Sequence, residues 1–504
     1  MTSSAFSSGR VTWALVASVL SQIVNAAHTY LLVPLFVSAW GSEKYGQWLS
    51  LTALATYIGL VDLGGQMCVG NRLATAFAQK RDHDFVDTLQ RGLSVISALA
   101  LAAWLVGAAC VLGTHNAWDT DSKLVMLLYS TAIAIAVPTG VLTTCYPATG
   151  RVVRGQNVGN VGRLITLALS MTALALQISQ PGYAGVQLAC AILMIGWVTI
   201  DLFRQAPDLF QPRFSVRALR DAVPLLRDSL PYWVFGLTNA LAVQGVLLAV
   251  SASADGQAVA TFTTHRAMAS VITYAGGLLR PAIWTELTFM AAHADYPRIR
   301  ALVRLIVRTT TWLAAVVGCT ICLAAPVAYT VWTRSRLQLD VPLLIILAAQ
   351  ATLWSAWSTL SWPLMSANKP RSLARWSLLN SALTVAGAYA CMRAGWGLRG
   401  VATWSLAVDV VCGLIPYPLA AFAFMQGSAW SFARDVVRAT LCSAPFALLA
   451  YGCLWIPGDL PRFASFALGC VLLSWPCLRL LYGARDFARV QGVLLGVVPW
   501  LRRA

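Results

Sequence analysis

TFTTHRAMASVITYAGGLLRPAIWTEL, residues 261–287, is an apolar stretch long enough to cross a membrane as a helix, yet it contains His265, Arg266 and Arg280. A helix needs about 20 predominantly apolar residues to cross the hydrocarbon of a bilayer. A charge at the centre of that hydrocarbon costs about 2.5 to 3.5 kcal/mol on insertion scales, so such residues face a bundle interior or a water-filled cavity. The stretch therefore predicts a membrane helix with one side turned away from lipid.

The rest of the chain has the same character. Of its 504 residues, 58% are hydrophobic and 11% are charged, whereas soluble domains carry about 25% charged residues. Apolar runs of about 20 residues recur from end to end, without the ~10-residue alternation of barrel strands. We predict an all-α polytopic membrane protein with about 14 transmembrane helices. The predicted spans are 12–38, 46–68, 92–113, 124–146, 158–178, 184–203, 230–252, 258–282, 309–330, 341–365, 376–392, 400–424, 437–456 and 463–482.

The basic residues predict the orientation, because Lys and Arg near span ends accumulate on the cytoplasmic side. With Met1 inside, 27 of the 36 Lys and Arg residues fall in inner segments and 7 in outer ones, and the remaining 2 are Arg266 and Arg280. Both termini are therefore expected in the cytoplasm. The first apolar run is too long for the core of a signal peptide, so it is expected to be retained as a span. The net charge of +17 is spread over every inner loop, which favours anionic lipid headgroups over nucleic acid as the partner.

The sequence argues against an enzyme and against a metal site. Nearly all of the 12 cysteines lie within apolar spans, including Cys319 and Cys322, so we interpret them as small buried hydrophobic residues. There is no P-loop, no H-E-x-x-H and no Gly-rich dinucleotide turn. No outer loop is long enough to carry the acidic active site of a membrane glycosyltransferase or polymerase. We expect neither a cofactor nor a catalytic residue.

The longest predicted inner segment, 204–229, divides the first twelve spans into two halves. Its arginines and its apolar residues fall on opposite helical stripes, so we expect it to lie flat on the inner surface or to be an ordinary basic linker. An offset of 217 residues aligns Thr56 with Thr273 and Tyr57 with Tyr274, which suggests two lobes related by a pseudo-two-fold axis. The predicted domains are an N-lobe at 1–203, the linker at 204–229, a C-lobe at 230–425, and two extra spans with a basic tail at 426–504.

Arg266 and Arg280 are predicted to share one wall of span eight. Fourteen steps of about 100° return to within about 40° of the same face. The planar fork of arginine suits bidentate phosphate recognition, so the two residues are candidates to hold a diphosphate at successive depths. The alternative is internal pairing, because Asp409 in span twelve lies at about the depth of Arg266.

Two acids in the spans are candidates for gating or ion coupling. Asp62 in span two lies at about the depth of Arg280, so one hypothesis is an ion pair between the halves that closes the inner mouth. The alternative is that Asp62 caps a helix end at Gly64 and Gly65. Asp62 and Asp409 are also the acids placed to sense an ion gradient or the membrane potential.

Polar residues in spans one and eight are candidates to line a cavity for sugar. Gln22, Asn25 and His28 stand three residues apart on one face of span one, where they would meet sugar hydroxyls or hold helices together. His265 is next to Arg266 but about 100° around the helix. Titration of its imidazole is a further hypothesis.

The stretch LLVPLFVSAWGSEKYGQWLSLTALATYIGLVDLGGQMCVGNRLA, residues 31–74, resembles the opening of Wzx-type polysaccharide-biosynthesis flippases. These belong to the multidrug/oligosaccharidyl-lipid/polysaccharide (MOP) exporter superfamily. The resemblance covers a proline ending span one, an outer G-x-x-x-Y-G with a following tryptophan, D-L-G, and an asparagine entering the loop. These residues are Pro34, Gly41, Tyr45, Gly46, Trp48, Asp62, Leu63, Gly64 and Asn71.

The resemblance implies a MATE/MOP-like bundle of two pseudo-symmetric six-helix lobes plus two C-terminal helices. Such a bundle would turn undecaprenyl-diphosphate-linked oligosaccharide repeat units across the bacterial inner membrane by alternating access. The superfamily's flippases are expected to hold the diphosphate with basic residues in the central cavity, and Arg266 matches an arginine in span eight of the related lipid II flippase. The further arginines expected in span one are missing here, where only Arg10 precedes the helix.

The resemblance also defines the expected partners and the alternatives. The partners are the undecaprenyl-diphosphate-linked glycan, membrane lipids, a polysaccharide polymerase and the export machinery, and not nucleic acid. One alternative is a MATE-like drug/cation antiporter, which would require acidic residues instead of arginines in the cavity. Another is a non-transporting membrane scaffold or enzyme subunit.

Overall fold

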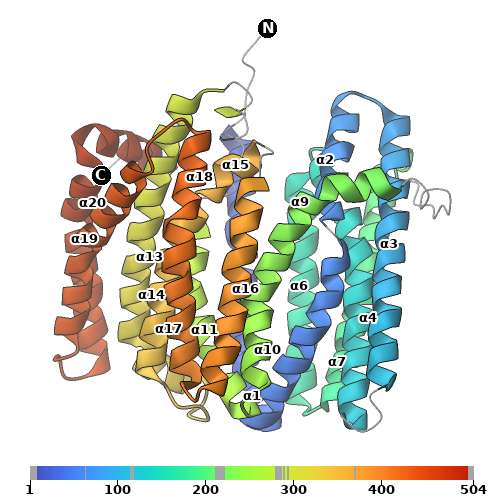
Figure 1. The fold of residues 1–504 in the computed structure, drawn as a ribbon, viewed down its shortest axis with the longest axis horizontal. Coiled ribbons are helices and arrows are strands. Elements are labelled where there is room, and N and C mark those ends of the chain that lie inside the picture. The colour runs from blue at the N-terminus through green and yellow to red at the C-terminus, as the bar shows by residue number, and fades with distance from the viewer. Residues whose placement is uncertain are drawn as a thin grey trace. The chain divides into compact units, whose positions relative to one another are not determined.

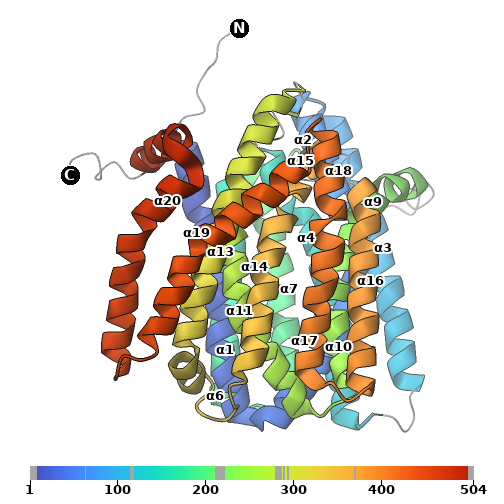
Figure 2. The same cartoon turned by 60° about the vertical axis from the view of Figure 1, so that its left-hand side comes forward.

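The computed structural model describes residues 8–62, 64–113, 118–210, 222–277, 287, 290, 291, 294–367 and 371–497. Within these ranges the secondary structure is helical and no strand occurs, so the all-α prediction is confirmed (Figures 1 and 2). Nine of the described helices are long and apolar enough to cross a membrane, or ten if the bent pair Tyr30–Leu60 and Gly65–Phe77 is one span. The count of 14 spans stays a prediction.

Contacts divide the chain into two compact units. Unit 1 comprises Met1–Val16, Thr263–Trp376 and Trp396–Ala504, and unit 2 comprises Ala17–Phe262 and Ser377–Gly395. Three of the four division points fall inside helices and the fourth, at Gly395, between two helices. None falls in the predicted linker, of which residues 211–221 lie outside the described residues. The two lobes inferred from the pseudo-repeat therefore stay a prediction.

Unit 2 contains most of the N-terminal helices. They are α1 (Ser8–Thr56), the 3-10 helix η1 (Tyr57–Asp62), α2 (Gly65–Ala78), α3 (Asp82–Gly113), α4 (Thr120–Thr143), α5 (Cys145–Ala148), α6 (Val152–Ala175), α7 (Gln180–Gln205), α9 (Ala222–Ala240), the π-helical turn η2 (Leu241–Gly245) and α10 (Val246–Ser251). Helix α4 packs on both α3 and α7, and α6 packs on α7 (Figure 1). The core of this bundle includes the fully buried side chains of Val69, Leu89, Val141, Tyr146 and Val198.

Gly41 interrupts α1 where the outer loop between spans one and two was predicted. Its φ of 79° and ψ of 169° suit glycine, which has no Cβ to clash. A Cβ on Gly46 would lie 1.8 Å from the carbonyl oxygen of Gly256, at the start of α11 (Gly256–Gly277), so the two backbones touch there. The carboxylate of Glu43 accepts hydrogen bonds of 3.1 Å from the N–H of Gly256 and 3.2 Å from the N–H of Gln257. The carboxylate of Glu43 therefore caps the N-terminus of α11, where the helix dipole favours a negative charge.

Unit 1 contains most of the C-terminal helices. They are the rest of α11, α13 (Tyr296–Trp332), α14 (Val341–Ser358), α15 (Ser361–Ser366), α17 (Gly397–Val408), the π-helical turn η3 (Asp409–Gly413), α18 (Pro416–Phe424), α19 (Trp430–Cys453) and α20 (Asp459–Val497). Most of α16 (Arg371–Arg393) belongs to unit 2. Helix α13 packs on α14 and α19, and α19 packs on α20 (Figure 2). The two helices that follow the predicted repeat are thus attached to α13.

Candidate functional site

The part of α11 that belongs to unit 1 has one buried face and one partly exposed face. His265, Ala269, Ile272 and Gly276 are buried. Ile272 faces α13, where a Cβ on Gly318 would lie 3.5 Å from its Cδ1, and Gly276 faces Ser355 of α14. The partly exposed residues recur every three or four positions, so they form a stripe along the helix. They are Thr263, Arg266, Ala267, Ser270, Val271, Thr273, Tyr274, Ala275 and Gly277.

Arg266 lies on this polar stripe, in the middle of the helix. It follows Gly256 by ten residues, which is about 15 Å along the axis. Helix α11 has 22 residues, enough to cross the hydrocarbon, but it is not among the nine helices that are apolar enough to do so. A helix of this composition in a membrane bundle has to be shielded from lipid. Arg280 lies outside the described residues, so the two-arginine wall stays a prediction.

His265 is fully buried where α11, α13 and α14 meet. Its Nε2 accepts a hydrogen bond of 2.9 Å from the backbone N–H of Asp340, and its Nδ1 lies 3.4 Å from the hydroxyl of Tyr329. That hydroxyl is also 2.9 Å from Oγ1 of Thr264. Because a backbone N–H can only donate, Nε2 carries no proton and the imidazole is neutral here. These contacts support a structural role, and contact of His265 with sugar stays a prediction.

Asp409 begins the π-helical turn η3 and is buried, with an exposed fraction of 5%. Its Oδ2 accepts a hydrogen bond of 3.0 Å from Nε2 of Gln350 in α14. Turns of this kind are frequent at functional sites. Gln350 was not predicted from the sequence, although an amide in the middle of predicted span ten was a usable signal. Pairing of Asp409 with Arg266 stays a prediction.

Asp62 ends η1 and closes the turn into α2. Its Oδ1 accepts a hydrogen bond of 2.9 Å from the N–H of Gly64, which has a φ of 72°. This is the local bond that an aspartate makes in a turn, and it supports the helix-cap alternative. The proposed gate needs Arg280, which the structure does not describe, so that pairing stays a prediction.

The polar face predicted on span one is described only in part. The side chains of Gln22 and Asn25 lie outside the described residues, whereas His28 is partly buried. Arg163 of α6 lies close enough to His28 for an electrostatic interaction between the two side chains. Three residues before Arg163, Asn160 is 2% exposed and its Oδ1 and Nδ2 both lack a hydrogen-bonding partner. This amide is near the start of predicted span five and was not predicted from the sequence.

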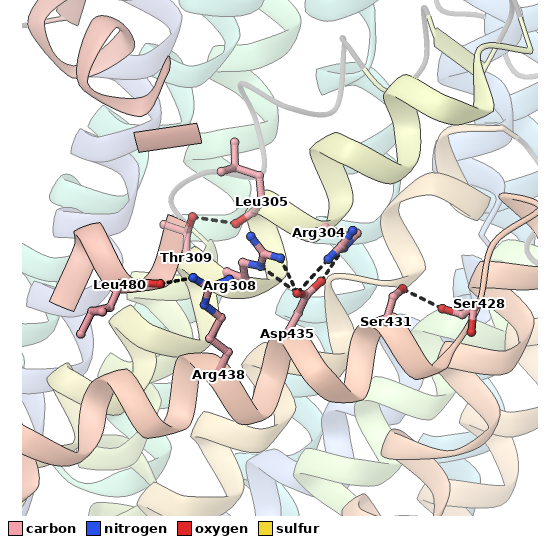
Figure 3. Close-up of polar contacts among 9 residues, drawn as sticks. All are labelled: Arg304, Leu305, Arg308, Thr309, Ser428, Ser431, Asp435, Arg438 and Leu480. Carbon is pink, nitrogen blue, oxygen red and sulfur yellow. Dashed lines mark hydrogen bonds and ion pairs between the residues drawn. The ribbon is translucent and has the colours of Figure 1, made fainter. Parts of the chain in front are cut away.

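Two buried carboxylates bind arginines from other helices. In unit 2, Asp201 of α7 accepts hydrogen bonds of 2.6 and 3.0 Å from Arg154 of α6 and one of 2.7 Å from the hydroxyl of Tyr146. In unit 1, the carboxylate of Asp435 in α19 accepts hydrogen bonds from two arginines of α13 (Figure 3). Neither acid was singled out from the sequence, because its partners are far away along the chain.

The cysteines and acids suggest no metal centre in the described part of the chain. All 12 cysteines are free thiols, and most of them are buried or partly buried. No group of three His, Cys, Asp or Glu side chains among the described residues lies close enough to hold a metal ion.

No family model matches this sequence, and no curated protein sequence matches it either. Solved structures do match. The lipid II flippase MurJ in an inward closed conformation superposes with a TM-score of 0.69 at 12% identity, covering 92% of this chain and 98% of that chain. The fold is that of MurJ and the MATE transporters. An inward-facing MATE family multidrug resistance transporter of the MOP superfamily has a TM-score of 0.61 at 16% identity, covering 81% of this chain and 99% of that chain.

A third match is a MOP superfamily transporter from Pyrococcus furiosus, with a TM-score of 0.56 at 15% identity, covering 83% of this chain and 97% of that chain. The predicted MATE/MOP-like fold is therefore confirmed, and with it a multi-pass membrane protein. At 12% to 16% identity these matches concern the fold and not the substrate.

Proposed function

We propose that this protein is a flippase that moves undecaprenyl-diphosphate-linked oligosaccharide repeat units across the bacterial inner membrane for polysaccharide biosynthesis. The observation that carries the proposal is the position of Arg266, on a partly exposed polar stripe in the middle of α11. A guanidinium at this depth is costly unless it faces water or an anion. Its fork fits the oxygens of a phosphate with two parallel hydrogen bonds.

The residues around Arg266 suit the rest of a polar headgroup. Ser270 and Thr273 donate to backbone carbonyl oxygens of their own helix, at 2.6 and 2.7 Å. Their oxygens therefore keep lone pairs that accept hydrogen bonds from sugar hydroxyls. The prenyl tail would stay in lipid during the passage, so the protein has to shield only the headgroup.

A MATE-like drug/cation antiporter is the alternative, and the buried acid Asp409 is the residue that would serve it. Two observations favour the flippase. The stripe carries a cation at mid-helix, which repels cationic substrates. MurJ covers 92% of this chain and the two MATE/MOP transporters cover 81% and 83%. The first twelve predicted spans end near residue 425 of 504, which is about 84% of the chain. The coverage by the two MATE/MOP transporters thus corresponds to these twelve spans, whereas the coverage by MurJ extends beyond them.

On this proposal the termini and most basic residues face the cytoplasm. The protein changes the location of its substrate and not its covalent structure, so it is not an enzyme. The lipid-linked glycan is its substrate, and a polysaccharide polymerase and the export machinery take the repeat unit on the other side.

The experiment is a gene deletion followed by complementation. The deletion should cause undecaprenyl-linked repeat units to accumulate on the cytoplasmic face, and the wild-type gene should clear them. Arg266→Ala should fail, whereas Arg266→Lys should restore part of the transport because it keeps the charge and loses the fork. Arg334→Ala is the matched control and should restore transport fully. Arg334 is an exposed arginine just after the C-terminal end of α13. Full transport by Arg266→Ala at equal protein level would overturn the proposal, and efflux of cationic dyes would favour the antiporter.

A further inference from the structure

The predicted inner ends of α13, α19 and α20 meet at a cluster of arginines within unit 1 (Figure 3). Asp435 of α19 has an exposed side-chain fraction of 1% and lies between Arg304 and Arg308 of α13. Arg304 donates to it at 2.7 and 3.2 Å, and Arg308 at 2.6 and 2.8 Å. One buried carboxylate thus fixes two guanidinium groups and joins α13 to α19.

Arg438 extends the cluster to α20. It follows Asp435 by three residues and therefore lies on the same side of α19. Its Nη2 donates to the carbonyl oxygen of Leu480 (Figure 3). A carbonyl is a neutral partner, so this bond orients the guanidinium without cancelling its charge. Thr309 and Tyr482 share a further hydrogen bond of 2.5 Å between α13 and α20.

The helix ends around Asp435 carry a large excess of positive charge. Residues 294–309, 428–442 and 476–482 contain seven arginines and two aspartates, which leaves a net charge of +5. One of the two aspartates, Asp295, pairs with Arg298 at 3.3 Å on the surface. Basic pockets between helices on the cytoplasmic side of a membrane attract anionic lipid headgroups.

Exposed apolar side chains continue from this cluster along both C-terminal helices. Leu441 and Leu448 of α19 and Leu468 and Leu472 of α20 are each more than 60% exposed. In a multi-pass membrane protein such side chains contact acyl chains. The surface therefore combines cations at one end with an apolar flank, which is the chemistry of a phospholipid and not of a free anion.

We propose that the inner ends of α13, α19 and α20 bind the phosphate of an anionic phospholipid, such as phosphatidylglycerol or cardiolipin. Arg304 and Arg438 contact the headgroup, and Asp435 keeps Arg304 and Arg308 in place. The acyl chains lie along the exposed leucines. This site is independent of Arg266 and of the transported substrate.

The test compares full-length protein in nanodiscs of phosphatidylcholine alone with nanodiscs that also contain phosphatidylglycerol. A lipid that binds the folded state raises the thermal midpoint, so the wild type should unfold at a higher temperature with phosphatidylglycerol, and less so at high salt. The double variant Arg304→Gln, Arg438→Gln should lose most of this rise. Glutamine removes the charge and keeps a polar side chain, and the midpoint in phosphatidylcholine reports whether the variant is folded. Arg334→Gln is the matched control and should keep the full rise.

Three results would overturn the proposal. The first is an equal rise in the double variant and the wild type, and each single variant provides the same comparison if the double variant does not fold. The second is an equal rise when inorganic phosphate is added to nanodiscs of phosphatidylcholine, because no acyl chain would then be needed. The third is a rise with undecaprenyl diphosphate but not with phosphatidylglycerol, because the surface would then belong to the transported lipid.

Discussion

His265 of α11 accepts a hydrogen bond of 2.9 Å from the backbone N–H of Asp340, the residue that caps α14. This bond fixes the rotation of α11 about its own axis. Arg266 follows by one residue, or about 100° around the helix, and is thereby placed on the polar stripe. A buried neutral histidine thus positions the neighbouring cation.

We expect His265→Phe to lower the free energy of unfolding by about 1 to 3 kcal/mol, because the N–H of Asp340 loses its acceptor while a ring still fills the space. Thermal or chemical unfolding of the purified protein measures this loss. His265→Gln is the control, since its amide oxygen is able to accept the same bond, and it should lose less. Equal losses in both variants would contradict the role of the Nε2 acceptor.

Asp340 should make stability depend on pH. Burial raises the pKa of Asp340, but the hydrogen bond from Arg399 and that from the N–H of Leu343 outweigh it, so the pKa lies below its ordinary value of 3.8. A lowered pKa in the folded state means that the carboxylate stabilises the fold above about pH 4, and that this contribution is lost as the pH falls through the folded-state pKa.

The difference in thermal midpoint between wild type and Asp340→Asn should therefore be constant from pH 7 to about pH 5 and shrink as the pH falls through the folded-state pKa, which lies below 3.8. Arg399→Gln should move this loss to a higher pH, because it removes the partner at 2.9 Å that lowers the pKa. A difference that grows on acidification would contradict the assignment.

Gly46→Ala should be among the most destabilising single substitutions in unit 2. The added Cβ would lie 1.8 Å from the carbonyl oxygen of Gly256, and a backbone cannot move aside as a flexible side chain does. Overpacking of this kind typically costs about 1 to 3 kcal/mol or more. In Gly196→Ala, the control in α7, the Cβ meets nothing within 4 Å. It should raise stability by about 0.5 to 1 kcal/mol in an unfolding measurement. Equal behaviour of the two variants would contradict the close approach.

Asn160→Leu separates a structural role from a functional one. Both amide atoms of Asn160 are buried without a partner, so an apolar residue of similar size should raise the free energy of unfolding by about 1 to 3 kcal/mol. We expect transport to fall in the same variant, because an unsatisfied amide retained near His28 and Arg163 suits a sugar ligand. If transport is unchanged, the amide of Asn160 does not contribute to substrate binding. If the variant is less stable than the wild type, the amide has a hydrogen-bonding partner after all.

The sequence was sufficient for the fold class but not for the ends of the helices. Apolar runs mark the part of a helix that lies in hydrocarbon. Helix α3 begins at Asp82, whereas the predicted span began at 92, and α13 begins at Tyr296, whereas its predicted span began at 309. In both cases the helix continues beyond the hydrocarbon with charged residues, such as Arg91 and Arg304, which hydropathy excludes from a span.

The same limit explains which polar residues were found. Arg266 was visible because a charge inside an apolar run stands out from its neighbours. Asp435 was not, because it lies just outside such a run and its partner Arg308 is 127 residues away. Pairing between distant helices depends on packing, which hydropathy and spacing within one helix do not report. The neutral state of His265 likewise follows only from the position of Asp340.

The composition of α11 also has a consequence for how the protein is made. A segment with a histidine and an arginine side by side at its centre does not leave the translocon for lipid on its own. The apolar helices α13 and α14, against which it packs, are synthesised after it. We therefore expect insertion of α11 to wait for them, with the cationic segment retained beside the translocon until its neighbours are made.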